Sequence, residues 1–450
     1  MRLSILRTSG FVVAVLAASP AFANDQTTPS PDAASSAAPA PAAAPAAPAA
    51  PTPYLKITGH IEAGLTGNTS KPQRTLNWGH LFTDRSTEPL LNQAMLTVEH
   101  DIDSSAKTAN WGFKVQGIYG SDARYTHTLG ILNNATDSIN QFDIVEAHVD
   151  AHLPIIASGG VDIKAGIYPT LEGVEVIDAT GNFFYSHNYI FNFGIPLKHT
   201  GVMTVSHFSH GIDIYIGVDS GVNTSFGKAG DENGAPAFHG GIGFTVGKNV
   251  TVLATTHIGP EDARGSCNFY VPSCPTINVN SALRYLNDIT ITAKLSPKLT
   301  SSTDINYIRD DGYKVSGGGI SEQLVYAYND YWSIGARAEV WDDGKGYFVS
   351  SFPGNHDYVS NELGLAASSG GVPNTSIFAP SVDTTYGALT LGINWKPKVP
   401  AVTKNFSIVV RPEVRYDASL NGTKVFKLST SNVGTKSDQF TVGFDAIVSF

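Results

Sequence analysis

The chain has 450 residues, of which 15% are charged, 10% are aromatic and 44 are glycine. Acidic residues outnumber basic ones by 39 to 29, and this excess of negative charge argues against nucleic acid as a partner. So few charges beside so many aromatic side chains argue against a water-soluble enzyme of ordinary design and favour a chain whose surface lies partly outside water.

Residues 1–23 have the features of a secretory signal peptide. Basic residues precede an apolar run at 11–18, and a small-x-small cleavage site follows at 21–23. The apolar run is shorter than the ~20 residues that a membrane-spanning helix needs. Because the chain is expected to be exported, Cys267 and Cys274, in a stretch rich in Gly, Ser and Pro, are predicted to form a small loop disulfide.

Residues 24–53 are predicted to be a linker and residues 54–450 a single domain of β-strands. The linker is rich in Pro and Ala and almost uncharged, which favours an extended periplasmic tether over a specific partner site. From residue 54 onward, apolar and polar residues alternate with a period of two, as in strands. Sixteen strands are predicted, at 54–67, 93–102, 111–120, 141–153, 160–169, 197–208, 211–220, 238–246, 249–258, 283–295, 299–310, 322–329, 331–341, 384–396, 406–417 and 439–450.

The connections between these strands alternate in length. Long gaps follow odd-numbered strands, at 68–92, 121–140, 170–196, 259–282 and 342–383, whereas even-numbered strands are followed by short turns. Outer-membrane barrels have an even number of strands, short periplasmic turns and longer external loops. The fold class is therefore expected to be all-β, a transmembrane antiparallel up-and-down barrel of about 16 strands, with 14 to 18 left open and both termini in the periplasm.

Alternation alone would also fit a soluble β-sandwich. The aromatic residues at positions whose side chains point outward favour a membrane barrel instead. They gather at the two ends of the predicted strands, as expected of the girdles that meet the membrane interfaces. Those at the periplasmic end are Trp111, Trp332, Trp395, Phe406 and Phe450, and those at the other end are Tyr119 and Tyr416. Phe450 ends the last strand, which must pair with the first to close the barrel, and it is similar to the carboxy-terminal signal read by the barrel assembly machinery.

Several long stretches resemble one known family. They are "LFTDRSTEPLLNQAMLTVEH", "GSDARYTHTLG", "NQFDIVEAHVDAHLP", "GIYPTLEGVEVIDATGNFFYSHNYIFNFGIPLKHTG" and "VDSGVNTSFG". Over about residues 59–240 the chain resembles the OmpL-like β-barrel porins of Gram-negative bacteria. The resemblance implies an outer-membrane barrel in contact with lipid and lipopolysaccharide. It brings no catalytic residues and no cofactor.

A sixteen-stranded barrel is wide enough for an aqueous channel unless loops fill it. The third long loop, residues 170–196, carries Glu172, Glu175 and Asp178 without any Lys or Arg, and then an aromatic-rich run, which predicts that it folds inward and narrows the pore. The basic wall opposite it would be the inward residues Arg337, Arg411 and Arg415. Two interpretations are left open. The acidic loop and the basic wall set up a transverse electric field across the constriction, or the arginines pair locally with Glu339 and Glu413 as ion pairs in the lumen.

The expected function is passive diffusion of small hydrophilic solutes or ions, with weak cation preference because inward acidic residues outnumber inward basic ones. The alternative is a non-conducting barrel, plugged by its loops, that acts as scaffold or adhesin. Homo-oligomerisation is left open. No catalytic or metal site is predicted. His207 and Ser209 resemble an outer-membrane phospholipase pair, but they lie at a predicted periplasmic turn, whereas that family acts near the outer leaflet on a smaller barrel. The polar face of strand 141–153 carries carboxylate and His side chains that could bind a metal, but a channel lining explains it better.

Overall fold

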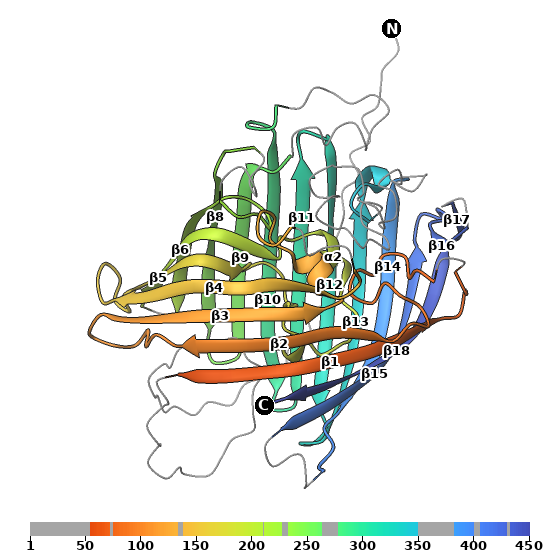
Figure 1. The fold of residues 1–450 in the computed structure, drawn as a ribbon, viewed down its shortest axis with the longest axis horizontal. Helices are drawn as coiled ribbons and strands as arrows, with labels where there is room; N and C mark the ends of the chain where they lie inside the picture. Colours follow the sequence, from red (N-terminus) through yellow and green to blue (C-terminus); the bar gives the residue numbers. More distant parts are fainter. Residues whose placement is uncertain are drawn as a thin grey trace, which may run out of the picture. The chain divides into compact units, whose positions relative to one another are not determined.

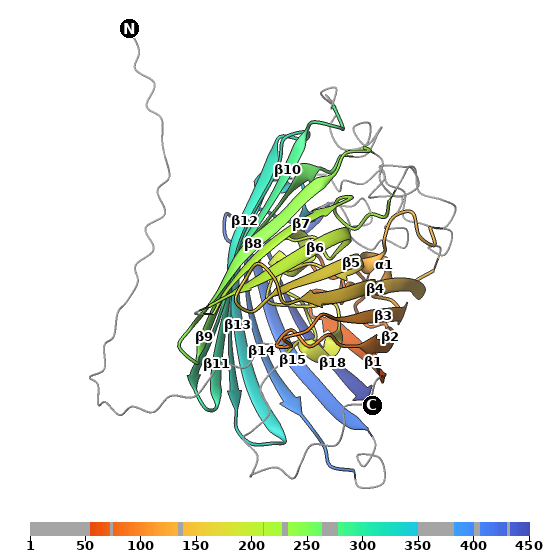
Figure 2. The ribbon, with the colours of Figure 1, turned by 90° about the vertical axis from the view of Figure 1, so that its left-hand side faces the viewer.

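The computed structural model describes residues 55–72, 75–133, 138–209, 211–226, 233–262, 278–349, 382–399, 406–429 and 433–450. The predicted signal peptide, the linker, Cys267 and Cys274 therefore lie outside the described residues. Within them, sixteen antiparallel strands form a closed barrel, drawn in Figure 1 and turned by 90° in Figure 2. This confirms the predicted fold class and strand number.

The strands of the barrel follow each other around the wall in chain order. They are β1 (Lys56–Asn68), β2 (Leu90–His100), β3 (Asn110–Gly120), β4 (Gln141–Leu153), β5 (Val161–Pro169), β6 (Lys198–Phe208), β7 (Ile212–Asp219), β8 (Ala237–Val246), β9 (Val250–Pro260), β10 (Leu283–Ser296), β11 (Leu299–Asp310), β12 (Val315–Ala327), β13 (Trp332–Asp343), β14 (Thr384–Trp395), β15 (Ser407–Ser419) and β18 (Asp438–Ser449).

The remaining elements are short and lie in the long connections. They are the helices α1 (Ala123–Thr126) and α2 (Tyr189–Phe193), the 3₁₀ turns η1 (Ala179–Gly181) and η2 (Gly344–Gly346), and a hairpin of β16 (Phe426–Leu428) and β17 (Gly434–Lys436). Among the described residues, no helix is both long and apolar enough to cross a membrane.

The largest difference from the predicted strand starts is at β12. β12 starts at Val315, seven residues before the predicted start at 322, and Gly317, Gly318 and Gly319 lie in the added part. Glycine carries no side chain, so this stretch shows no alternation of apolar and polar residues. The glycines allow close approach instead, because a Cβ added at Gly319 would lie 2.2 Å from the carbonyl oxygen of Val340.

The two faces of the wall differ as the alternation predicts. On β15, Arg411 and Arg415 are buried inside while Val414 and Tyr416 are exposed outside. Aromatic residues on the outer face gather at both ends of the strands. At the short-turn end, Trp332 and Trp395 pair across β13 and β14, with stacked rings whose centroids are 5.6 Å apart. Those at the long-loop end include Tyr119, Phe142, Tyr416 and Phe440, of which the first two and the last two are paired across strands.

The barrel closes between β1 and β18. Phe450 donates its backbone N–H to the carbonyl oxygen of Gly59 (3.0 Å) and accepts the N–H of Gly59 in return (3.3 Å). Its ring lies 6.4 Å from that of Phe406, measured between centroids. Closure of this kind leaves no strand edge open for pairing with another chain. A role of Phe450 as assembly signal stays a prediction.

The long-loop half of the barrel interior holds an apolar core, which is unusual for a barrel with a polar interior. The loops contribute its aromatic side chains together with the inward faces of β13 and β14. These aromatic residues are Trp78, Phe82, Tyr125, Tyr189, Phe191, Phe193, Tyr313, Trp341, Phe348, Tyr386 and Phe426. The indole N–H of Trp78 donates to the hydroxyl of Tyr386 at 3.1 Å, and the ring of Tyr386 stacks on Tyr189 with centroids 5.0 Å apart.

Candidate functional site

The connection between β5 and β6, residues 170–197 and called loop 3 below, runs across the interior of the barrel. Near its start, the N–H of Gly173 donates to the carboxylate of Asp288 on β10 (3.0 Å). Farther on, the N–H of Ala179 donates to the amide oxygen of Gln93 on β2 (3.2 Å). In the ring of sixteen strands β2 and β10 stand eight places apart. Loop 3 is therefore fixed to opposite walls.

The second part of loop 3 is held by acidic residues of two further strands. Glu413 on β15 accepts the N–H of Tyr185 at 2.9 Å and that of Ser186 at 3.2 Å. Glu339 on β13 accepts the N–H of Tyr189, the first residue of α2, at 2.7 Å. A carboxylate at the N-terminus of a helix satisfies a backbone donor that has no partner within the helix. These contacts orient α2, whose aromatic residues then pack in the interior core.

Arg337 and Glu175 form a buried ion pair between wall and loop. The Nη1 atom of Arg337 lies 2.6 Å from Oε1 of Glu175 and donates to the carbonyl oxygen of Ser186 at 2.7 Å. The guanidinium also lies over the ring of Phe184, 4.9 Å from its centroid. The predicted transverse field is wrong for this pair, because the loop acid touches the wall arginine instead of facing it across water.

Arg411 and Arg415 are also neutralised by carboxylates. Arg411 contacts Asp445 at 2.6 Å and Glu62 at 2.7 Å. Arg415 contacts Asp417 at 2.8 Å and Glu339 at 3.2 Å. Local pairing, the other interpretation of the sequence, therefore describes these two arginines, although the partner of Arg411 is not Glu413.

All three arginines also donate to backbone carbonyl oxygens of loop 3. Ser186 accepts from Arg337, His187 accepts from Arg415 at 2.7 Å, and Ala179 accepts from Arg411 at 3.0 Å. A planar guanidinium presents five donors and so suits a position between a carboxylate and a carbonyl group. The wall arginines therefore clamp the loop, a role different from the lining of an open surface.

The three acidic residues of loop 3 are in different states. Burial raises the pKa of Glu172 to about 8, so this carboxyl is neutral at pH 7. Glu175 is ionised, but its charge is balanced by Arg337. The side chain of Asp178 is 35% exposed and accepts from the N–H of Thr180. Of the three predicted constriction residues, Asp178 is the one whose carboxylate is not buried.

The docking of loop 3 is expected to weaken in acid. Burial alone would raise the pKa of Glu175, but Arg337 and the hydrogen bonds from His187 and Asn188 lower it from 4.5 to about 2. A depressed carboxyl pKa stabilises the docked loop above pH 4.5, and this contribution, roughly 3 kcal/mol, is lost as the pH falls towards 2. Hydrogen exchange of loop 3, corrected for intrinsic rates, should show lower protection at pH 3 than at pH 7.

The matched control is Glu175→Gln, which removes the titrating group. In this variant protection should already be reduced at pH 7 and should change little between pH 7 and pH 3. Equal protection of wild-type loop 3 at the two pH values would contradict this assignment.

The polar face of β4 forms an ion-pair ladder with its neighbours in the short-turn half. Glu146 contacts Lys114 at 2.7 Å and His148 at 3.0 Å, and His148 also contacts Asp150 at 3.0 Å. His152 contacts Asp162 at 2.6 Å. Because each of these groups already has a charged partner, the ladder is better described as interior lining than as a metal site.

His207 is not oriented towards Ser209. Its Nδ1 atom contacts Asp213 at 2.7 Å and its Nε2 atom contacts Asp162 at 3.0 Å. Both ring nitrogens thus face carboxylates, and the geometry does not favour a serine hydrolase pair, which needs one nitrogen within reach of the hydroxyl.

Gln93 and Asp288, the anchors of loop 3 on opposite walls, are absent from the predicted site. The alternation along each strand places both side chains on the inner face, and this can be seen in the sequence. Many other polar residues have the same placement. The path of the loop is what distinguishes them.

Comparison with known proteins agrees with this architecture. The family model described as "Putative beta-barrel porin-2, OmpL-like" matches residues 54–450. No curated protein matches the sequence significantly. Similar solved structures include an anion-selective porin from Comamonas acidovorans (TM-score 0.53, 9% identity, 88% of this chain and 99% of that chain covered). OprB of Pseudomonas putida (0.51, 11%, 88% and 94%) and OmpF of Salmonella typhi (0.51, 10%, 87% and 97%) are comparable. At these identities the similarity shows the fold.

Proposed function

The chain belongs to the putative beta-barrel porin-2, OmpL-like family and is thus a porin-like barrel of the outer membrane. From this we propose that it conducts small hydrophilic solutes by passive diffusion, past a constriction formed by loop 3. The observation that carries this proposal is the attachment of loop 3 to β10 at Gly173 and to β2 at Ala179. A segment fixed to opposite walls reduces the free cross-section wherever it runs. The short-turn half, which opens to the periplasm in this proposal, keeps a polar lining.

The lining of that half supports weak cation preference. The side chains of Asp178, Asp213 and Asp162 are 35%, 37% and 16% exposed, respectively. Three lysines lie among them, Lys56, Lys114 and Lys164, at 54%, 28% and 36%, and each is close to a carboxylate. Counted with the less exposed carboxylates of Glu99, Glu146 and Asp150, the acidic groups outnumber these lysines by six to three. An excess of acidic groups favours cations.

Single-channel recording of the purified, refolded protein in a planar bilayer under a salt gradient tests this function. We expect regular conductance steps and a reversal potential on the cation side. Asp178→Asn should reduce the cation preference, whereas Asp311→Asn, which removes a charge paired with Arg309 at the outer end of β11, should leave it unchanged. A reversal potential on the anion side would exclude the proposed selectivity.

A second candidate function is a non-conducting scaffold or adhesin. It is favoured by the apolar core that Trp78, Tyr189, Trp341 and Tyr386 form inside the long-loop half. Absence of conductance from a barrel shown to be folded by its heat-dependent electrophoretic mobility would support this candidate and reject the channel. Homo-oligomerisation and contacts with lipopolysaccharide and the barrel assembly machinery stay predictions.

A further inference from the structure

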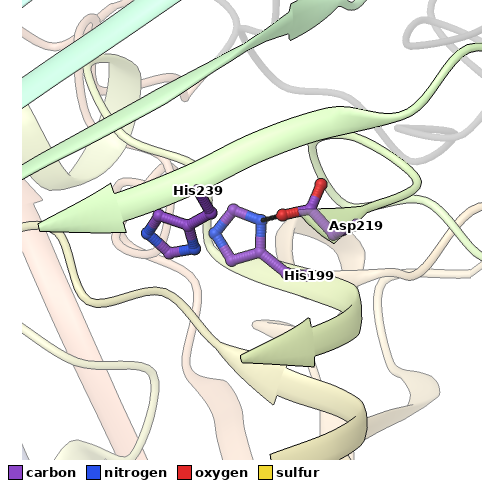
Figure 3. Close-up of side chains that lie close together, drawn as sticks. All are labelled: His199, Asp219 and His239. Atoms are coloured by element: carbon purple, nitrogen blue, oxygen red, sulfur yellow. Dashed lines mark ion pairs between the residues drawn. The ribbon is translucent and has the colours of Figure 1, made fainter. Parts of the chain in front are cut away.

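Four ionisable side chains meet inside the wall formed by β6 to β9, away from loop 3's arginine clamps. They are His199 on β6, Asp219 on β7, His239 on β8 and His257 on β9. Their exposed fractions are between 0% and 3%, so the whole group is buried. Figure 3 shows the ring of His199 between the ring of His239 and the carboxylate of Asp219, with both imidazoles directed towards the same space.

The register of the strands creates this group. His239 and His257 are direct cross-strand partners on β8 and β9. Asp219 pairs with Gly201 on β6, two residues after His199, and with Ala237 on β8, two residues before His239. Side chains two residues apart share a face of the sheet. The four polar groups therefore converge on the inner face near the long-loop end of the wall.

The hydrogen-bonding capacity of the group is poorly used. Among the described residues, neither ring nitrogen of His239 has a hydrogen-bond partner, although the side chain is completely buried. His199 lies 3.1 Å from Asp219 through Nδ1, but the pair is misaligned for a hydrogen bond and both nitrogens of His199 lack one. A buried polar group without a partner destabilises a fold, because it loses its hydrogen bonds to water and gains none in the protein. Such unsatisfied donors and acceptors in a native fold indicate a missing partner.

We propose that His199, Asp219 and His239 bind a divalent transition-metal ion of the Zn²⁺ class. The three residues each offer one ligand atom, and these atoms lie within 4.8 Å of one another. Zn²⁺ binds imidazole nitrogen and carboxylate oxygen at about 2.0–2.2 Å, commonly with three protein ligands and a fourth position taken by water. Two imidazoles with one carboxylate suit Zn²⁺, Ni²⁺ or Cu²⁺, whereas Ca²⁺ and Mg²⁺ prefer sites made of oxygen ligands.

His257 positions the carboxylate of the site. Its Nε2 atom contacts Oδ1 of Asp219 at 3.0 Å, and the N–H of Gly221 donates to the same oxygen at 2.9 Å. These contacts leave Oδ2, which has no hydrogen-bond partner among the described residues, directed towards His199. Groups that orient a metal ligand in this way commonly change metal affinity by about 10- to 100-fold when they are removed.

The test is metal binding by the full-length protein after treatment with a chelator. Isothermal titration with Zn²⁺ should show saturable binding of one equivalent, and Co²⁺ should give the visible absorption of a four-coordinate ion with imidazole ligands. His239→Gln should abolish this saturable site, and His257→Gln should weaken it by about 10- to 100-fold. The matched control is His60→Gln, which replaces another buried inward histidine, one hydrogen-bonded to Gln93 on β2.

Two results would overturn the proposal. One is the absence of saturable Zn²⁺ binding by the folded wild-type protein. The other is equal binding by His239→Gln and His60→Gln, which would assign the metal to other histidines. If His239→Gln does not fold, His199→Gln serves in its place, and the Co²⁺ spectrum of the wild-type protein remains decisive.

Discussion

Replacing Arg337 by alanine is expected to release loop 3 from the wall and to raise conductance. The substitution leaves Glu175 as a buried carboxylate without its cation and leaves the carbonyl of Ser186 without its donor. Removing one partner of a buried ion pair typically costs about 3–5 kcal/mol. The barrel should still form, because the backbone pairing of β13 with β12 and β14 does not involve this side chain.

The measurement is single-channel conductance beside the heat-dependent mobility of the folded barrel. We expect larger or more variable steps for Arg337→Ala than for the wild type, or the appearance of steps if the wild type is closed. Arg309→Ala is the control, since Arg309 is 55% exposed and pairs with Asp311 outside the interior. Unchanged conductance in a folded Arg337→Ala barrel would contradict the clamp.

Replacing Arg411 by alanine is expected to destabilise the barrel itself. Arg411 lies on β15 and joins Glu62 on β1 to Asp445 on β18, the strands at which the wall closes. Without it, two buried carboxylates face each other with no cation between them. The free energy of unfolding should fall by about 3–5 kcal/mol.

Denaturant unfolding in lipid vesicles measures this change. The triple variant Arg411→Met, Glu62→Gln, Asp445→Asn removes the charges together and should recover most of the loss, because a neutral replacement of a buried ionic group is commonly tolerated. Lys56→Ala is the control: Lys56 pairs with Glu99 near the short-turn end and is 54% exposed, so the expected effect is within about 1 kcal/mol. Equal losses for Arg411→Ala and Lys56→Ala would refute the role of this cluster.

The wall of the barrel could be predicted from the sequence because each strand has one face towards lipid and one towards the interior. That requirement imposes the alternation on every strand, and it fails where side chains are missing, as at Gly317 to Gly319 in β12. The predicted strands 322–329 and 331–341 left Asp330 alone between them, but the connection is longer in the structure, where β12 ends at Ala327 and β13 begins at Trp332.

The interior could be predicted only as a list of inward residues. Parity places Arg337, Arg411 and Arg415 on the inner face, but their carbonyl partners depend on the path of loop 3, which no local pattern fixes. His199 and His239 illustrate the same limit: about 40 residues of sequence separate them, and the register of β6 to β8 brings them together.

The five tryptophans fall into two optically distinct populations. Trp111, Trp332 and Trp395 are between 40% and 55% exposed on the outer face, whereas Trp78 and Trp341 are at 4% and 0% in the interior. A quencher attached to lipid acyl chains should therefore reduce the fluorescence of the three outer tryptophans and leave that of the two interior ones unchanged. The remaining emission comes from the two interior indoles, which pack against the loops. Its wavelength and intensity therefore report whether the loops stay packed in the interior while the surrounding wall stays folded.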